Sequence, residues 1–187
     1  MAWKNDQVLE KETAKIIELA SSCLDLGGDY VEMGCYKGDT SLILADVLLS
    51  GPRRPRLYIY DSFEGLPEKT ESDESVLGED FKGGELFVTK REVKQRFLKA
   101  GLPVPVIKKA WFKDLKPDDL PEKIAFSFLD GDFYESIKDS LRLVAPKMAS
   151  GGVLVVHDYN NPALPGVSKA VDEFVAGKKF DFKIVLL

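Results

Sequence analysis

The sequence has few of the residues that build disulfide frameworks, cysteine-rich metal sites or basic surfaces. Cys23 and Cys35 are the only cysteines among 187 residues, which excludes a disulfide scaffold and a four-cysteine zinc site. Acidic residues outnumber basic ones by 31 to 26, so nothing in the charge balance favours nucleic acid or an anionic membrane as a partner. No apolar run approaches the roughly 20 residues of a membrane-spanning helix. The N-terminus has no apolar signal-peptide core, and we expect a cytoplasmic protein.

What remains is the composition of an ordinary globular chain, with 44% apolar and 30% charged residues. Its length predicts a single domain over residues 1–187, with residues 1–28 forming an N-terminal helical segment. Helical spacing of apolar residues predicts helices over residues 8–24, 40–49, 89–101, 136–145 and 167–175. Short apolar runs predict strands over residues 30–33, 57–60, 104–107, 124–129, 153–156 and 183–187.

Apolar strands that alternate with helices favour a parallel sheet covered on both faces. The sequence therefore predicts a doubly wound α/β fold with a mostly parallel sheet, whose ligands bind at the carboxyl ends of the strands. Pro105 cannot donate a hydrogen bond within a sheet, so its strand is expected at an edge. Residues 64–84 are acidic and rich in glycine, and they predict a long mobile surface loop, either a lid or a solvated insertion without a role.

A turn containing glycines follows the first predicted strand. Glu32 precedes Gly34 and Gly38, and a helix begins at Thr40. Glycine lets the backbone turn sharply and approach a ligand, and the helix N-terminus offers unpaired N–H groups. The spacing differs from the dinucleotide pattern G-x-G-x-x-G. It predicts a site for a nucleoside cofactor, although such turns also occur without a ligand.

Acidic residues and the single histidine follow the other strands. Asp61 ends the second strand and could accept hydrogen bonds from two ribose hydroxyls, or serve as a loop or cap acid. Asp130 and Asp132 follow one later strand, and His157 and Asp158 follow another. Carboxylates gathered at one sheet edge need a cation or a proton between them. Oxygen ligands favour magnesium, calcium or manganese, and an imidazole shifts the preference towards manganese, iron or zinc. The alternative is that Asp130 and Asp158 only cap the following helices.

These motifs resemble those of class I S-adenosylmethionine-dependent methyltransferases. The turn from Glu32 to Thr40, with Tyr36 inside it, is similar to the first motif of the metal-dependent catechol-type O-methyltransferases. The closer resemblance, over about residues 29–177, is to the macrocin O-methyltransferase family. It is carried by the segments Asp61–Pro67, Leu129–Ser136, Ala145–Lys147 with Gly151–Gly152, and Pro165–Phe174.

The resemblance implies transfer of a methyl group from S-adenosylmethionine to a hydroxyl of a small molecule, often a sugar. By matching position, Asp61 and Ser62 hold the ribose of the cofactor. Trp111 and Phe112 lie near its adenine, with core packing as the alternative. The resemblance places the following further residues around the cofactor: Glu32, Gly34, Tyr36, Gly38, Thr40 and Asp130.

The resemblance also implies a divalent metal, magnesium with manganese as the alternative, held by Asp130, His157 and Asp158, with Asp132 as the general base. The family usually has two acids where this chain has His157 and Asp158. His157 could bind the metal, act as the base, or mark a lost site; we expect a weaker but retained site. Phe133 replaces the catalytic lysine of the catechol-type enzymes.

The chain is shorter at both ends than the family usually is, and one edge strand is expected to be missing. An exposed sheet edge can pair with another copy, so a homodimer is expected. Three other functions stay open: a non-catalytic cofactor-binding protein, a nicotinamide-dependent oxidoreductase, which the glycine spacing disfavours, and a purely structural domain.

Overall fold

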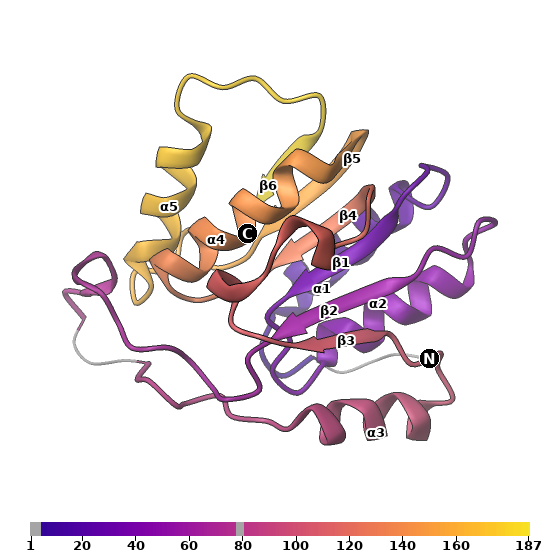
Figure 1. Cartoon of the computed structure of the whole chain (residues 1–187), viewed down its shortest axis with the longest axis horizontal. Coiled ribbons are helices and arrows are strands. Elements are labelled where there is room, and N and C mark those ends of the chain that lie inside the picture. Colours follow the sequence, from indigo (N-terminus) through magenta and orange to yellow (C-terminus); the bar gives the residue numbers. More distant parts are fainter. Residues whose placement is uncertain (1–4, 78–80) are drawn as a thin grey trace.

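The computed structural model describes residues 5–77 and 81–187 and contains one parallel sheet in that part of the chain (Figure 1). The sheet has six strands in the order β3-β2-β1-β4-β5-β6. All neighbouring strands run parallel, which confirms the doubly wound α/β fold. The strands are β1 (Asp29–Met33), β2 (Leu57–Asp61), β3 (Val106–Lys109), β4 (Ile124–Leu129), β5 (Met148–Val156) and β6 (Lys183–Leu186).

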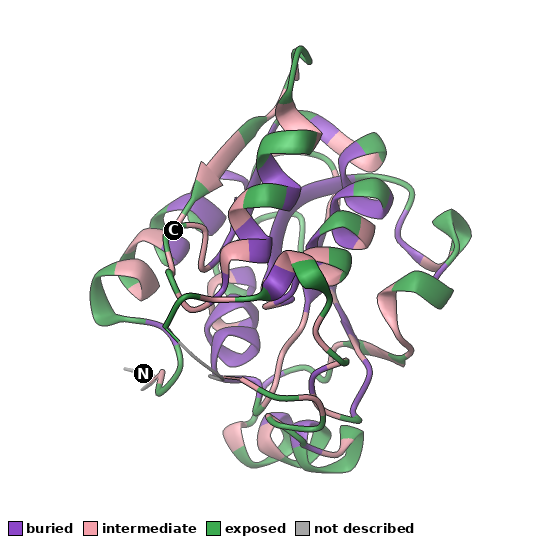
Figure 2. Cartoon of the chain, turned by 90° about the vertical axis from the view of Figure 1, so that its left-hand side faces the viewer, coloured by how far each residue is buried: buried purple, intermediate pink, exposed green. Residues whose placement is uncertain are grey.

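Five α-helices cover the two faces of the sheet in the described residues. They are α1 (Glu10–Ser22), α2 (Asp39–Leu49), α3 (Lys90–Ala100), α4 (Tyr134–Val144) and α5 (Pro165–Val175). Helices α1, α2 and α3 contribute to one apolar cluster, and α4 and α5 contribute to a second cluster on the other face (Figure 1). Figure 2 shows the buried strands between helices whose outer surfaces are exposed.

Local sequence explains where several elements begin and end. Helix α3 has the expected capping box: the Glu92 amide donates to the Thr89 hydroxyl, and the Thr89 amide donates to the Glu92 carboxylate. The helix ends at Gly101, which takes the left-handed conformation at φ 67°. The elements differ from the predicted ranges mainly at their ends, because caps and turns rather than apolar spacing decide the last residues.

Two strands differ more clearly from the prediction. Strand β3 begins at Val106, so Pro105 lies just before the strand, although β3 is the edge strand that was expected. Strand β5 begins five residues earlier than expected, at Met148, because its first part pairs with Ile124 through a register shift before the apolar run. Apolar runs identified the buried part of β5 and missed its more exposed beginning.

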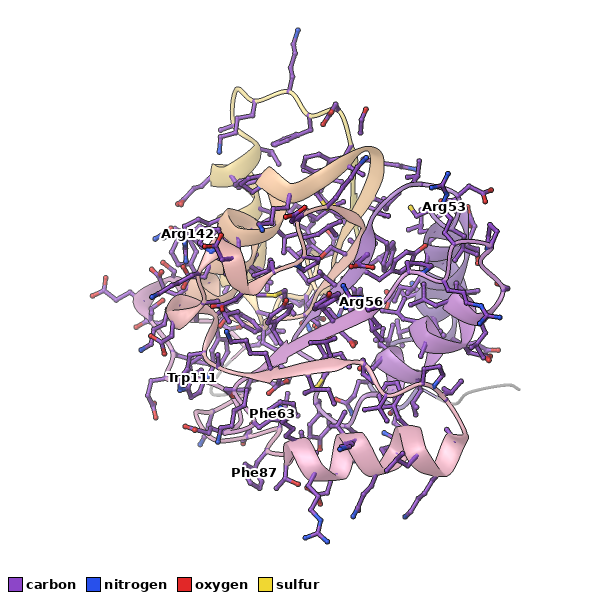
Figure 3. All side chains as sticks on the ribbon, turned by 45° about the vertical axis from the view of Figure 1, so that its right-hand side comes forward. Arg53, Arg56, Phe63, Phe87, Trp111 and Arg142 are labelled. Atoms are coloured by element: carbon purple, nitrogen blue, oxygen red, sulfur yellow. The ribbon has the colours of Figure 1, made fainter. Side chains whose placement is uncertain are left out.

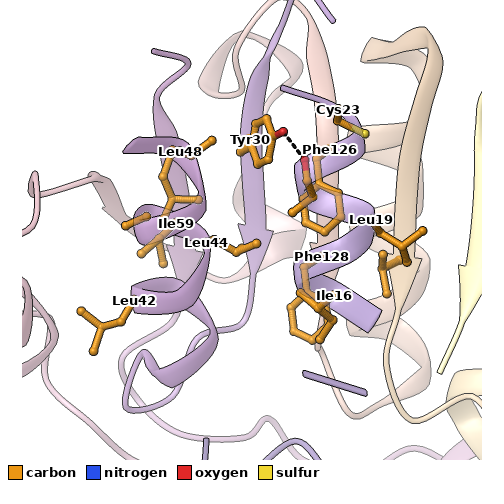
Figure 4. Close-up of a cluster of buried hydrophobic side chains, with 14 of the residues drawn as sticks. Ile16, Leu19, Cys23, Tyr30, Leu42, Leu44, Leu48, Ile59, Phe126 and Phe128 are labelled. Carbon is orange, nitrogen blue, oxygen red and sulfur yellow. Dashed lines mark hydrogen bonds between the residues drawn. The ribbon is translucent and has the colours of Figure 1, made fainter. Parts of the chain in front are cut away.

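The core between α1 and the sheet is built from aromatic and branched side chains (Figure 4). Tyr30 and Phe126 lie with their ring centroids 5.3 Å apart, and the Tyr30 hydroxyl donates a hydrogen bond of 2.6 Å to the Ala20 carbonyl. Two apolar residues of the first predicted helix do not join this core: Leu9 is 59% exposed and Ile17 is 39% exposed. The buried face of α1 is therefore narrower than its apolar composition suggests.

The acidic segment 64–84, for which the sequence predicts a mobile surface loop, is joined to α4 through Asp73. Asp73 is buried and accepts hydrogen bonds from the Tyr134 amide (2.6 Å) and the Thr70 amide (2.9 Å). It thereby pairs an N–H group of the first turn of α4, which no intrahelical bond satisfies. Residue 166 on α5 must be glycine, because a Cβ atom there would lie 2.0 Å from Asp73 Oδ1. Residues 78–80 of this segment lie outside the described residues.

Among the described residues, none of the helices combines the length and the apolar character that crossing a bilayer requires.

Candidate active site

The carboxyl ends of four strands lie level with one another. Met33 pairs with both Tyr60 and Leu129, and Leu129 pairs with Val156. The residues that follow these strands therefore meet at one sheet edge, where a pocket opens. Of the predicted site residues, the pocket is lined by Glu32, Gly34, Tyr36, Thr40, Asp61, Ser62, Trp111, Phe112, Asp130, Asp132, His157 and Asp158. Gly38 does not line the pocket; it precedes α2 in a left-handed conformation at φ 82°.

The glycine turn between β1 and α2 is compact because β4 ends against it. Gly34 has φ +89°, and a Cβ atom there would lie 2.0 Å from the Asp130 carbonyl oxygen. Only glycine fits this position, since both the backbone angle and the space exclude a side chain. Arg96 of α3 fixes the far side of the turn: it donates to the Lys37 carbonyl at 2.7 Å and forms an ion pair with Asp39 at 2.5 Å.

Glu32 is a fully buried carboxylate beside this turn. Its Oε2 accepts a hydrogen bond from the Ser41 hydroxyl, and its Oε1 has no partner. Burial raises the pKa of Glu32 to about 8; the Ser41 hydrogen bond opposes this, and the charges of Asp130 and Asp61 add to it. A buried acceptor without a partner is costly, so Glu32 is suited to bind a cationic or N–H group in the pocket.

Asp61 connects two of the strand ends. Its Oδ2 accepts from the Cys35 amide at 2.9 Å, and its Oδ1 accepts from the Phe63 amide at 2.7 Å. Asp61 therefore accepts hydrogen bonds from loop amides, which was the alternative to a ribose-binding role, and it also lines the pocket. Each carboxylate oxygen can accept more than one hydrogen bond, so both roles are compatible.

Asp130, His157 and Asp158 form a compact cluster at the ends of β4 and β5. His157 Nδ1 lies 3.0 Å from Asp130 Oδ1 and 2.9 Å from Asp158 Oδ2. One ligand atom from each residue lies within 4.8 Å of the others, as a metal site requires. Helices α4 and α5 have no side-chain hydrogen bond at their N-caps, so neither aspartate caps them.

The charges in this cluster shift its pKa values strongly. Burial lowers the pKa of His157, but the charge of Asp130 and the hydrogen bonds to Asp130 and Asp158 outweigh it and raise the value to about 11. Burial raises the pKa of Asp158. The hydrogen bond and charge of His157 lower it by more than burial raises it, so the pKa of Asp158 lies below its ordinary value. In the protein without a metal, His157 is thus an imidazolium at neutral pH and cannot accept a proton.

Asp132 stands beside this cluster with an unusual backbone. Its φ of 59° is uncommon for a residue other than glycine, and such conformations concentrate at functional sites. Burial raises the pKa of Asp132 well above its ordinary value, and the charges of Asp130 and Asp158 raise it further. A carboxylate with a raised pKa is a stronger base than an ordinary aspartate.

Trp111 and Phe112 follow β3 and form another wall of the pocket. Both side chains are partly buried, and Phe112 also packs against the apolar cluster on the α4 face. Figure 3 labels Trp111 and shows it on the same side of the molecule as Phe63. Flat aromatic side chains on a pocket wall can stack with a planar ring such as adenine.

Several pocket residues carried no signal in the sequence. They are Asn5, Gln7, Phe81, Leu86 and Asn161. Asn5 reaches the site because its side chain donates to the Thr40 hydroxyl at 2.9 Å, and Asn161 donates to Asp158 at 2.9 Å. They come from loops whose path depends on tertiary contacts, and only Asn161, three residues after Asp158, is close in sequence to a predicted site residue.

Comparison with known proteins identifies the family. The family model described as macrocin-O-methyltransferase (TylF) matches residues 11–185. The chain belongs to the macrocin-O-methyltransferase family. Membership in this methyltransferase family confirms the resemblance and favours S-adenosylmethionine over a nicotinamide as the cofactor.

Two curated relatives of this macrocin-O-methyltransferase family member come from Streptomyces. The 8-demethyl-8-(2,3-dimethoxy-alpha-L-rhamnosyl)-tetracenomycin-C 4'-O-methyltransferase of Streptomyces olivaceus is 33% identical over 139 residues, covering 71% of this chain and 53% of that protein. Demethyldecarbamoylnovobiocin O-methyltransferase of Streptomyces niveus is 32% identical over 168 residues, covering 82% of this chain and 60% of that protein. The chain thus spans little more than half the length of these relatives.

Solved structures agree on the fold. The O-methyltransferase NovP superposes with a TM-score of 0.77 at 28% identity, covering 89% of this chain and 71% of that one. The calicheamicin methyltransferase CalS11 superposes with a TM-score of 0.73 at 19% identity, covering 91% and 72%, which supports the fold alone.

Proposed function

We propose that this chain forms a single methyltransferase domain that transfers the methyl group of S-adenosylmethionine to a hydroxyl of a small molecule. One observation carries the proposal: Glu32, Asp61 and the Asp130–Asp132 segment, from three different strand ends, line a single pocket. The names of the relatives specify methylation of an oxygen, in one case on a compound that carries a dimethoxy-rhamnosyl group. A sugar hydroxyl is therefore the acceptor we propose to test first.

The cofactor would lie across the glycine turn. The unpartnered oxygen of Glu32 suits the ammonium group of the methionine part, and Gly34 lines the pocket beside it. Asp61 and Ser62 suit the ribose hydroxyls, and Trp111 and Phe112 suit the adenine. Tyr36, Thr40 and Asp130 complete the lining.

A divalent ion fits the cluster of Asp130, His157 and Asp158. Their donor atoms lie about as far apart as neighbouring ligands of one ion, 2.9 to 3.0 Å from Nδ1 to each carboxylate oxygen. Two carboxylates alone suit magnesium, and the imidazole nitrogen moves the preference towards manganese. When bound, such an ion would lower the pKa of an acceptor hydroxyl and orient it.

The protein's own contribution is to position the reactants and take up a proton. S-adenosylmethionine carries an activated methyl group, so alignment with the acceptor supplies much of the rate. Asp132 is the base we propose, because its pKa is raised while the protonated His157 has no free site for a proton. A metal ion bound beside it would favour the ionised form of Asp132, which can take up a proton.

Calorimetric titration with S-adenosylhomocysteine, with and without Mn²⁺ or Mg²⁺, tests this proposal. We expect binding that strengthens when the metal is present. The Asp130→Asn variant should then lose turnover with sugar and catechol acceptors while it still binds S-adenosylhomocysteine. Absence of S-adenosylhomocysteine binding to the wild-type chain would contradict the proposal.

A non-catalytic cofactor-binding protein is the second candidate, and His157 is the observation that favours it. An imidazolium between Asp130 and Asp158 offsets part of their negative charge without a metal. If this candidate is correct, the chain should bind S-adenosylhomocysteine with an affinity that does not change with Mn²⁺. It should transfer no methyl group to any acceptor. The same titration separates the two.

We also propose that the protein acts in the cytoplasm and that two copies associate. The free thiols Cys23 and Cys35 suit a reducing compartment. Strands β3 and β6 are the two edges of the sheet, and the outer side of an edge strand can pair with another chain. Sedimentation equilibrium measures the mass, and a monomer at all concentrations would contradict the dimer.

A further inference from the structure

A carboxylate from the N-terminal helix reaches the histidine of the proposed metal site. Glu12, in the first turn of α1, places its Oε2 3.6 Å from His157 Nε2. Its side chain is 20% exposed, and that of His157 is 9% exposed. None of the cofactor or acceptor roles described above uses Glu12, and its sequence position gave no reason to connect it with His157.

The two ring nitrogens of His157 face different partners. Nδ1 faces Asp130 and Asp158, at 3.0 and 2.9 Å, whereas Nε2 faces Glu12. The bond that one imidazole nitrogen makes decides which nitrogen carries the proton in the neutral ring. A carboxylate at Nε2 favours the proton there and leaves the Nδ1 lone pair directed at the two aspartates.

We propose that Glu12 is a positioning residue that makes His157 Nδ1 a metal ligand. The inference rests on the metal site of the proposed function. Histidines that bind metals almost always donate their other N–H to a carboxylate or carbonyl, which fixes the ring and increases its basicity. Glu12 would thus compensate for a histidine at a position where the family usually has an acid.

The packing around the ring holds it in this orientation. The Phe128 ring lies 5.8 Å from the His157 ring, measured between centroids, and the His157 amide donates to the Leu129 carbonyl at 3.0 Å. Glu12 and Ile16 are four residues apart on α1 and so share one face of the helix. Ile16 is buried beside Phe128 of β4 in the core (Figure 4), so this face of α1 is turned towards the sheet.

The contact between Glu12 and His157 is at ion-pair rather than hydrogen-bond distance. Closing it to a hydrogen bond takes a shift of about half an ångström. The Glu12 side chain has several torsions through which this shift can occur, and its partial exposure leaves room for it. We expect the shift to occur when a metal takes the Nδ1 lone pair, because the proton is then confined to Nε2.

The test measures affinity for Mn²⁺ by calorimetry, in the presence of S-adenosylhomocysteine. The variants are Glu12→Gln and, as a matched control from the same helix turn, Glu10→Gln at an exposed position. We expect Glu12→Gln to weaken Mn²⁺ binding by about 10- to 100-fold. We expect Glu10→Gln to bind as the wild type does.

The same Glu12→Gln substitution in a His157→Asp protein distinguishes two explanations. Glu12 either orients the His157 ring or attracts the metal through its negative charge. In His157→Asp the imidazole is absent, so Glu12→Gln should no longer weaken Mn²⁺ binding. An equal loss in both backgrounds would overturn the proposal, because it would mean that Glu12 acts only through its negative charge. Circular dichroism checks that each variant folds, and Glu12→Ala repeats the test if Glu12→Gln is unstable.

The outcomes separate this proposal from the one on which it rests. Wild-type binding of Mn²⁺ with no effect of Glu12→Gln would overturn only the role of Glu12. No Mn²⁺ binding by the wild type would overturn both that role and the metal site. Binding of S-adenosylhomocysteine in that case would still support the methyltransferase proposal without a metal.

Discussion

Single side chains at the end of the sheet carry the proposed chemistry, and their surroundings decide what each can do. Asp130, Asp132 and Asp158 are the same residue type in one pocket, yet their surroundings suit different proposed roles. Asp158 is held ionised by His157 and Asn161, with a lowered pKa. Asp132 has a raised pKa, which suits a base that acts in the reaction.

Replacement of Asp132 by asparagine tests the base directly. The amide keeps the shape of the side chain but cannot take a proton, so we expect kcat to fall by about 10²- to 10⁴-fold. Affinity for S-adenosylhomocysteine should change little. Steady-state kinetics and calorimetry measure the two effects, with the exposed Asp118→Asn as the control. Wild-type kcat in Asp132→Asn would exclude Asp132 as the base.

Glu32 gives a prediction about stability and pH. The pKa of this group rises from 4.5 to about 8 on folding, so between these values the native state binds its proton more tightly than the unfolded state does. The contribution of Glu32 to the free energy of unfolding therefore falls as pH rises from 4.5 towards 8. Glutamine cannot ionise, so the stability of Glu32→Gln relative to the wild type should increase with pH.

The measurement is urea unfolding of both proteins, without cofactor, at pH 5 and pH 9. We expect the difference in unfolding free energy to shift by more than about 1 kcal/mol in favour of Glu32→Gln at the higher pH. The exposed Glu10→Gln should show no such shift. A constant difference across pH would mean that Glu32 titrates normally. Binding of S-adenosylhomocysteine should weaken in Glu32→Gln.

At the scale of elements, the segment between β2 and α3 shows how one buried acid organises a long connection. Asp73 joins this segment to the start of α4 and lies against Gly166 of α5. Lys169 of α5 adds a hydrogen bond of 2.9 Å to Ser72. The segment is thus attached to α4 and α5, and its residues Phe81 and Leu86 line the pocket.

We expect Asp73→Ala to release this segment. The change leaves the Tyr134 and Thr70 amides without their partner, which should lower the unfolding free energy by about 1–3 kcal/mol. Limited proteolysis should then cut within residues 64–84 faster than in the wild type. Glu74→Ala is the matched control, because the neighbouring side chain is exposed. Equal cleavage rates in the two variants would show that Asp73 does not anchor the segment.

At the scale of the whole molecule, the proposed cofactor pocket joins the halves of the sheet. Residues at or just after the carboxyl ends of β1, β2, β4 and β5 line it, and so do Asn5 and Gln7 near the N-terminus. A ligand that contacts all these segments should stabilise the fold as a unit, since it binds the native state and not the unfolded chain.

Thermal unfolding with S-adenosylhomocysteine checks this expectation. At a ligand concentration one hundred times its dissociation constant, the stabilisation should be about 2.7 kcal/mol, seen as a rise in Tm. NADH at the same concentration should leave Tm unchanged, in line with the family. A rise in Tm with NADH alone would contradict the cofactor assignment.

Local sequence patterns predict most of the helices and strands of the fold. Apolar runs placed β4 at the residues observed, and the capping box with Gly101 placed α3, because these signals are local and act within one turn or strand. The order of strands and helices then determined which strand ends share an edge. Glu32, Asp61, Asp130 and His157 could therefore be assigned to one site before any contact was known.

Tertiary structure alone decided the contacts between segments far apart in the sequence. The carboxylates of Asp73 and Glu12 reach Tyr134 and His157 across 61 and 145 positions of the chain, and no local pattern encodes either contact. The burial that raises the pKa of Glu32 and the space that requires Gly34 likewise arise only when β1 and β4 pack together. Local sequence sets the elements because their hydrogen bonds are local, whereas charge and space in the site depend on the whole packed chain.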